Sequence, residues 1–246
     1  MLYFGIKIEK IRFAVLTVGA LLLFVQISLA QKRRLQGPMN YEHFSKKNFY
    51  FGITLGYNQS YHDIRYNKSF ILNDSVQQLQ SIEGPGFNLG IVGNLKFGKN
   101  LDLRFLLPTL SFAERRLNYQ MLNNPNILQK KLESVLLEFP VHFRYKSMPY
   151  KDFRFFVVAG VKYSIDLASN SKTRQADDLI KILPQDLALE IGFGFQVFFP
   201  YFILSPEIKL SYGVMNIHAR NPSLIYSSPI EKLFSRGIAI SFHFEG

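Results

Sequence analysis

Polar and apolar residues alternate along most of the chain from Asn48 onward. In the first such segment, Phe49, Phe51 and Ile53 alternate with Tyr50 and Gly52. A period of two residues places successive side chains on opposite faces of a β-strand. The segment therefore predicts a strand with one continuous apolar face.

Seven further segments repeat this alternation. They are Phe87–Phe97, Leu101–Leu107, Val135–Tyr145, Phe153–Ile165, Leu187–Val197, Ile208–Val214 and Ile238–Phe244. No apolar run in this part of the chain reaches the roughly 20 residues that a membrane-spanning helix needs. We therefore predict eight strands and an all-β fold.

The predicted links between the strands alternate in length. Short links fall at 98–100, 147–152 and 200–202, and long links fall at 63–85, 117–132, 168–185 and 217–236. Outer-membrane barrels join their strands by short turns on the periplasmic side and by long loops outside. The sequence therefore predicts an eight-stranded antiparallel up-and-down transmembrane β-barrel over residues 48–246, with both termini in the periplasm.

The polar faces of the predicted strands carry glycines and charges of both signs. The charged positions are Asp102, Arg104, Glu138, Arg144, Lys162, Glu190, Glu207 and Lys209. A soluble barrel, whose polar face meets water and whose apolar face fills the interior, is the structural alternative. We expect the charges to face inward and to form a structural ion-pair network, because an unpaired buried charge is costly. A solute or proton path along the same side chains is the functional alternative, although an eight-stranded barrel has little room beyond its own side chains.

The first thirty residues resemble a secretory signal. Lys7 and Lys10 precede an apolar stretch over Phe13–Ile27, and Ser28–Ala30 forms a small-x-small cleavage site. We predict a signal peptide at 1–30, a periplasmic N-terminal segment at 31–47 and localisation in the cell outer membrane. An uncleaved membrane anchor is the alternative.

Composition removes several classes of function. The chain has no Cys, which excludes disulfides and thiolate chemistry, so we expect no cofactor and no metal. The net charge of +11 is spread over the whole sequence without a basic helix or an RNA-binding aromatic motif, so we expect no nucleic-acid partner. We interpret this charge as affinity for anionic lipid or acidic envelope partners.

No motif indicates an enzyme or a small-molecule substrate. The sequence lacks G-x-S-x-G and H-E-x-x-H. A lipid-modifying enzyme stays an alternative, because His62 and His218 lie near the predicted outer rim, as do Ser60, Ser69 and other serines. We predict that the chain is not an enzyme.

The predicted outer loops contain apolar clusters that are candidate contact residues. They are Phe70, Ile71, Leu72, Leu224, Ile225 and Tyr226. Exposed apolar clusters often mark contact surfaces. Packing of these residues on one another, as a cap over the barrel, is the alternative.

Five segments carry a resemblance to a known family. They are Asn48–Ser60, Leu137–Lys146, Leu189–Phe195, Phe198–Phe202 and Leu204–Gly213, and the L-S-P-E-I-K-L-S-Y-G stretch is the most specific of them. Together they resemble the PorT family, the outer-membrane barrels of Bacteroidetes associated with the type IX secretion system. One departure is at the end of the chain, where Glu245-Gly246 follows Phe244 instead of a terminal aromatic residue.

The resemblance implies a barrel that supports export of cargo proteins with C-terminal sorting domains. It implies a scaffold or interaction protein rather than a pore, with outer-membrane lipid and other secretion-system proteins as partners. It carries no catalytic residues over to this chain. A stand-alone outer-membrane adhesin or binding barrel is the alternative function.

Overall fold

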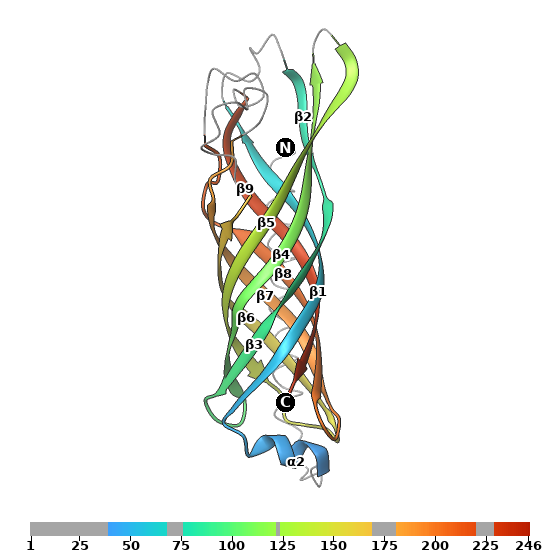
Figure 1. Ribbon diagram of the computed structural model, residues 1–246, viewed down its shortest axis with the longest axis vertical. Coiled ribbons are helices and arrows are strands. Elements are labelled where there is room, and N and C mark those ends of the chain that lie inside the picture. The colour runs from blue at the N-terminus through green and yellow to red at the C-terminus, as the bar shows by residue number, and fades with distance from the viewer. Residues whose placement is uncertain (1–38, 68–75, 122–123, 169–180, 220–228) are drawn as a thin grey trace, which may run out of the picture. The chain divides into compact units, whose positions relative to one another are not determined.

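The computed structural model describes residues 39–67, 76–121, 124–168, 181–219 and 229–246, which form an antiparallel barrel with a short helix at one end (Figure 1). The helix is α2 (Met39–Ser45). The strands are β1 (Phe49–Tyr66), β2 (Val76–Ile82), β3 (Gly84–Lys96), β4 (Leu101–Met121), β5 (Asn124–Lys146), β6 (Phe153–Asp166), β7 (Gln185–Phe198), β8 (Ile203–Gly213) and β9 (Ile230–Glu245).

Each strand of the ring pairs with its neighbours in sequence. The order β4-β3-β1-β9-β8-β7-β6-β5 is closed by pairing of β4 with β5, and all pairs are antiparallel. β2 pairs with β4 just beyond the end of β3, and only Glu83 separates β2 from β3. β2 and β3 thus act as one interrupted strand, and the predicted eight-stranded up-and-down barrel is confirmed.

The alternation in the sequence sorts the two faces of the sheet. Large apolar side chains point outward, as shown by Phe193 of β7, which is 63% exposed. Tyr50 of β1 lies on the inner face of the sheet and is only 4% exposed. Glu207 and Asp102 also lie on the inner face and are buried. The polarity of the barrel is therefore apolar outside and polar inside, which is the reverse of a soluble barrel.

A bulge in β4 changes which residues face inward. The pairing of β4 with β5 shifts between Phe105 and Thr109, and both Leu107 and Pro108 lie on the outer side. Pro108 has no backbone N–H to donate, so it is tolerated where the hydrogen-bond ladder is interrupted. As a result Thr109, and after it Arg115, point into the barrel.

The short links lie together at one end, which we call the turn end, and the opposite end is the loop end. The chain at the turn end bends at Gly98, with φ of 117°, and at Lys151, with φ of 51°. The left-handed region that these values occupy favours glycine, which fits the first of these turns. Figure 1 shows α2 and the C-terminus at this same end.

Strands at the loop end are longer than predicted. The predicted loop at 117–132 is wrong, because β4 runs to Met121 and β5 begins at Asn124. The predicted loops at 63–85 and 217–236 are likewise shortened, since β1 runs to Tyr66, β2 occupies Val76–Ile82 and β9 begins at Ile230. The outward positions of the β4 extension, such as Arg116 and Asn118, are polar, whereas Leu117 and Tyr119 face inward. The extension therefore lacks the outward apolar face from which the strands are predicted.

Two apolar clusters occupy the ends of the barrel. At the turn end, Phe44 of α2 packs with Tyr50, Phe198 and Ile203. At the loop end, the apolar cap consists of Leu79, Leu117, Tyr119, Ile182, Ile217, Ile230 and Leu233. Among the described residues, no helix is long and apolar enough to cross a membrane.

Candidate functional site

All eight charged residues predicted to face inward do so, and the structure brings them together in the barrel interior. Seven are buried, and Lys162, whose side chain is 17% exposed, is the most accessible. The set joins two linked groups. The turn-end network comprises Tyr50, Asp102, Arg104, Arg144, Lys146, Glu207 and Glu245, and the central network comprises Glu138, His142, Lys162, Glu190 and Lys209.

The turn-end network crosses the barrel lumen. Arg104 on β4 contacts Glu207 on β8 and Glu245 on β9, each with a nitrogen-to-oxygen distance of 2.5 Å. β4 and β8 stand four places apart in a ring of eight strands, so the Arg104–Glu207 pair joins opposite walls. These charge-assisted contacts therefore span the lumen at this level.

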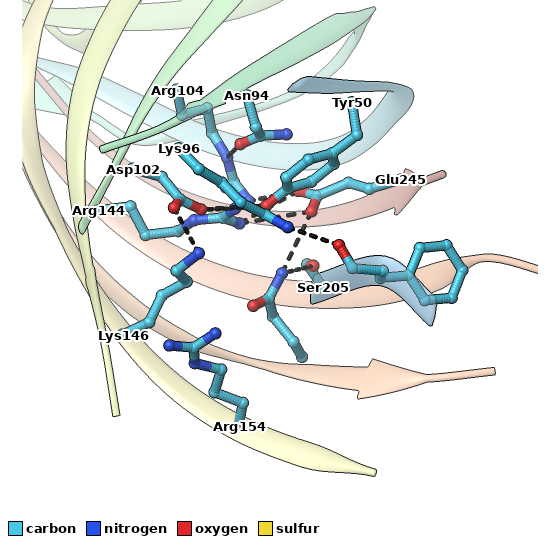
Figure 2. Close-up of polar contacts among 12 residues, drawn as sticks. Tyr50, Asn94, Lys96, Asp102, Arg104, Arg144, Lys146, Arg154, Ser205 and Glu245 are labelled. Carbon is cyan, nitrogen blue, oxygen red and sulfur yellow. Dashed lines mark hydrogen bonds and ion pairs between the residues drawn. The ribbon is translucent and has the colours of Figure 1, made fainter. Parts of the chain in front are cut away.

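A second contact between opposite walls runs beside the first. Arg144 on β5 lies 3.3 Å from Glu245 on β9, and its Nη2 donates to Asp102 at 2.7 Å. Lys146 also donates to Asp102, and Arg144 donates to the Tyr50 hydroxyl (Figure 2). Asp102 and Glu245 therefore each contact at least two donors.

The central network lies between the turn-end network and the apolar cap. Lys162 contacts Glu138 at 2.9 Å and Glu190 at 3.1 Å, and the Nε2 atom of His142 lies 2.7 Å from Glu190. Lys209 lies 3.6 Å from Glu190 and 3.7 Å from Glu207, which links the two groups.

The two networks balance in formal charge. Five carboxylates (Asp102, Glu138, Glu190, Glu207 and Glu245) face five cations (Arg104, Arg144, Lys146, Lys162 and Lys209), so the sum is 5 − 5 = 0. A neutral set of paired charges is the form in which burial costs least.

Sequence reasoning missed part of the turn-end network. Lys146 and Glu245 were not among the predicted residues, although both continue the polar parity of their strands. Glu245 interrupts the apolar end of the chain and accepts contacts from Arg104, Arg144 and Gln196. This role gives a physical reason for a charged residue at that position.

A small cavity lies between the central network and the apolar cap. It has a volume of about 60 Å³, and its lining includes Ser60, Arg115, Glu138 and Asp186. The volume is enough for a few water molecules and for no larger solute. Leu117, which is the next inward position after Arg115, already belongs to the apolar cap.

Among the described residues considered for catalysis, Ser60 and His62 do not form a Ser–His pair. Ser60 accepts a hydrogen bond from Arg115, and neither ring nitrogen of the buried His62 has a hydrogen-bond partner. Ser69 lies outside the described residues, as do the contact candidates Phe70, Ile71, Leu72, Leu224, Ile225 and Tyr226. Within the described ranges, no group of three metal-ligating side chains comes together.

Comparison with known proteins places the chain among outer-membrane barrels. A family model described as "Outer membrane protein beta-barrel domain" matches residues 29–219. A search of curated proteins found no match.

Solved structures similar to this chain are small outer-membrane proteins. Ail, the attachment invasion locus protein of Yersinia pestis, is 13% identical with a TM-score of 0.37, covering 81% of this chain and 100% of its own. OprG from Pseudomonas aeruginosa is 12% identical with a TM-score of 0.42, covering 79% and 96%. Neisserial surface protein A is 11% identical with a TM-score of 0.41, covering 80% and 97%.

Proposed function

We propose that this chain, which belongs to the outer membrane protein beta-barrel domain family, is a barrel component of type IX protein secretion. In this role it supports export of cargo proteins with C-terminal sorting domains. It acts as a scaffold or interaction protein, and outer-membrane lipid and other secretion-system proteins are its partners.

The closed lumen is the observation that favours a scaffold over a pore. The Arg104–Glu207 and Arg144–Glu245 contacts join opposite walls near the turn end, and the apolar cap fills the loop end. A polypeptide or a solute has no path between these barriers. Function therefore rests on the surfaces at the two ends of the barrel.

The resemblance to the PorT family supports the secretion role. Its most specific segments, Phe198–Phe202 and Leu204–Gly213, form the β7–β8 hairpin and its turn at the turn end. Tyr201 in this turn is 90% exposed. Aromatic side chains are enriched at protein contact surfaces. Tyr201 is therefore the partner contact that we propose first, together with the contact candidates predicted from the sequence, Phe70, Ile71, Leu72, Leu224, Ile225 and Tyr226.

The position of the short turns sets the orientation that we propose for the barrel in the membrane. The three short turns, α2 and the C-terminal Gly246 lie at the turn end (Figure 1). Short turns face the periplasm in outer-membrane barrels. In this orientation the first and last residues of the barrel domain lie in the periplasm, as does Tyr201.

Deletion of the gene and assay of secreted cargo tests the proposal. We expect cargo with C-terminal sorting domains to accumulate in the cells and to disappear from the medium, with recovery on complementation by the wild-type gene. Complementation by Tyr201→Ala should be impaired. The matched control is Tyr150→Ala, which removes an exposed tyrosine from another turn at the same end.

Normal export in the deletion strain would contradict the proposal and would favour a stand-alone adhesin or binding barrel. Loss of export with full rescue by Tyr201→Ala would keep the secretion role and reject this turn as the partner contact.

A further inference from the structure

The turn end holds a second cavity that differs from the balanced interior. It has a volume of about 520 Å³ and lies between the barrel mouth and α2. Tyr41, Phe44 and Phe198 form part of its apolar wall. A cavity of this size falls in the range of ligand pockets.

The polar lining of this cavity is entirely neutral or cationic. Four cations line it, Lys96, Lys99, Lys146 and Arg154, and no carboxylate does. Lys146 is neutralised by Asp102 within the turn-end network. None of the ion pairs of the described residues includes Lys96, Lys99 or Arg154. Lys99 is exposed to solvent, so Lys96 and Arg154 are the two shielded cations of the lining without a carboxylate partner.

Arg154 is the more buried of these two cations. It is 4% exposed, its Nε donates to the Ser147 carbonyl at 2.6 Å and its Nη2 donates to the Lys99 carbonyl. A guanidinium has five N–H donors, so these two contacts fix its orientation and leave three donors unused. The guanidinium carbon also lies 5.7 Å from the centre of the Tyr41 ring. Because none of the described carboxylates pairs with this buried cation, an anion would complete its surroundings.

Lys96 approaches the same space from β3. Its Nζ donates to the Phe44 carbonyl of α2 at 2.6 Å and lies 5.2 Å from the centre of the Tyr50 ring. Figure 2 shows Lys96, Lys146 and Arg154 extending from three strands toward one region. The acidic side chains of the neighbouring elements, Glu42 of α2 and Asp152 of the β5–β6 turn, are not part of the lining.

We propose that this cavity is a binding site for a phosphate group. A carboxylate would neutralise one of the charges of Arg154 and Lys96, whereas a phosphate dianion neutralises both and offers oxygens to each. The phosphate comes from a lipid headgroup or from a soluble phosphate compound. This inference does not depend on the role in secretion, because the site would bind phosphate in a barrel of any function.

The test is phosphate binding by the full-length folded barrel in micelles of a phosphate-free maltoside detergent, measured by isothermal titration calorimetry with inorganic phosphate. A second arm adds phosphatidic acid to the micelles and follows its ³¹P NMR signal. Saturable binding of inorganic phosphate identifies a soluble source. A shifted phosphatidic acid signal without binding of inorganic phosphate identifies a lipid source.

In whichever of the two measurements detects binding, Arg154→Gln should weaken the affinity by about tenfold or more, as expected for loss of a charge-assisted contact. Lys96→Gln should weaken it as well, and serves if Arg154→Gln does not fold. Lys46→Gln is the matched control, because it removes an exposed cation at the same end outside the cavity, and it should change the affinity less than about twofold. Folding of each variant is checked by the mobility difference between folded and unfolded barrel on a gel.

No binding in either arm would overturn the proposal. An equal loss of affinity in Arg154→Gln and Lys46→Gln would also overturn it, because the anion would then respond to general surface charge and not to this cavity.

Discussion

The two ends of the barrel lumen are closed by different chemistry. The turn end is closed by Arg104, Arg144, Glu207 and Glu245, whose side chains are fully buried and paired across the lumen. The loop end is closed by the apolar cap, in which Leu117 and Leu233 are fully buried. Paired charges have fixed partners and directions, whereas apolar contacts depend on volume and shape. An isosteric change that removes one charge should therefore damage the turn end, and a change of volume should damage the loop end.

The largest effect is expected from Glu245→Gln. The variant keeps the shape of the side chain but leaves Arg104 and Arg144 without one of their shared carboxylates, so the free energy of unfolding should fall by about 4 kcal/mol. Because the chain has no Trp, folded barrel in urea is best measured by gel mobility or circular dichroism. Glu231→Gln, at an exposed position of the same strand, is the control and should have almost no effect. Equal stabilities of the two variants would refute the structural role of the turn-end network.

Leu233→Ala should have the second largest effect. Leu233 is fully buried in the apolar cap, and its truncation removes apolar contacts and leaves a cavity, at a cost of about 3 kcal/mol in the free energy of unfolding. Leu183→Ala removes an exposed leucine near the cap and should cost much less. If both leucines cost the same, the cap is not a packed barrier.

Lys162→Gln should lower the free energy of unfolding by about 1–2 kcal/mol. It removes the shared partner of Glu138 and Glu190. Lys162 lines the small cavity between the central network and the apolar cap, where water can solvate the two carboxylates. Urea unfolding measures the change. A loss as large as that of Glu245→Gln would show that the cavity is dry.

The smallest effect is expected from Asp63→Asn. Asp63 lies 2.9 Å from Arg236, but its side chain is 32% exposed, so the pair should contribute about 0.5 kcal/mol and less at high salt. Unfolding of this variant is compared with the wild type at low and at high ionic strength. A large effect that does not depend on salt would place this pair with the buried networks.

The sequence predicted the central features of the barrel because they rest on local alternation. The two-residue period alone predicts that the apolar side chains face outward and that Glu138, Lys162 and Glu207 face inward. Which charges meet across the lumen depends on strand order and register, so the Arg104–Glu207 pair could not be read from the sequence.

The remaining errors also have physical causes. The β4 bulge at Pro108 moves the inward-facing positions by one residue. The alternation before the bulge therefore does not predict that Arg115 faces inward. The end of the β4–β5 hairpin escapes the prediction because its outward residues are polar, while its apolar residues Leu117 and Tyr119 face inward. The cationic cavity escaped notice because Lys96 and Arg154 converge only when the barrel closes.

The central claim is that the barrel is a closed scaffold, and ion conductance across a planar lipid bilayer tests it most directly. The folded wild-type protein should insert without steady open-channel current at either polarity, because the turn-end network and the apolar cap block the lumen in series. A stable unitary conductance from the wild-type barrel would contradict the account and would make the interior charges the lining of a pore.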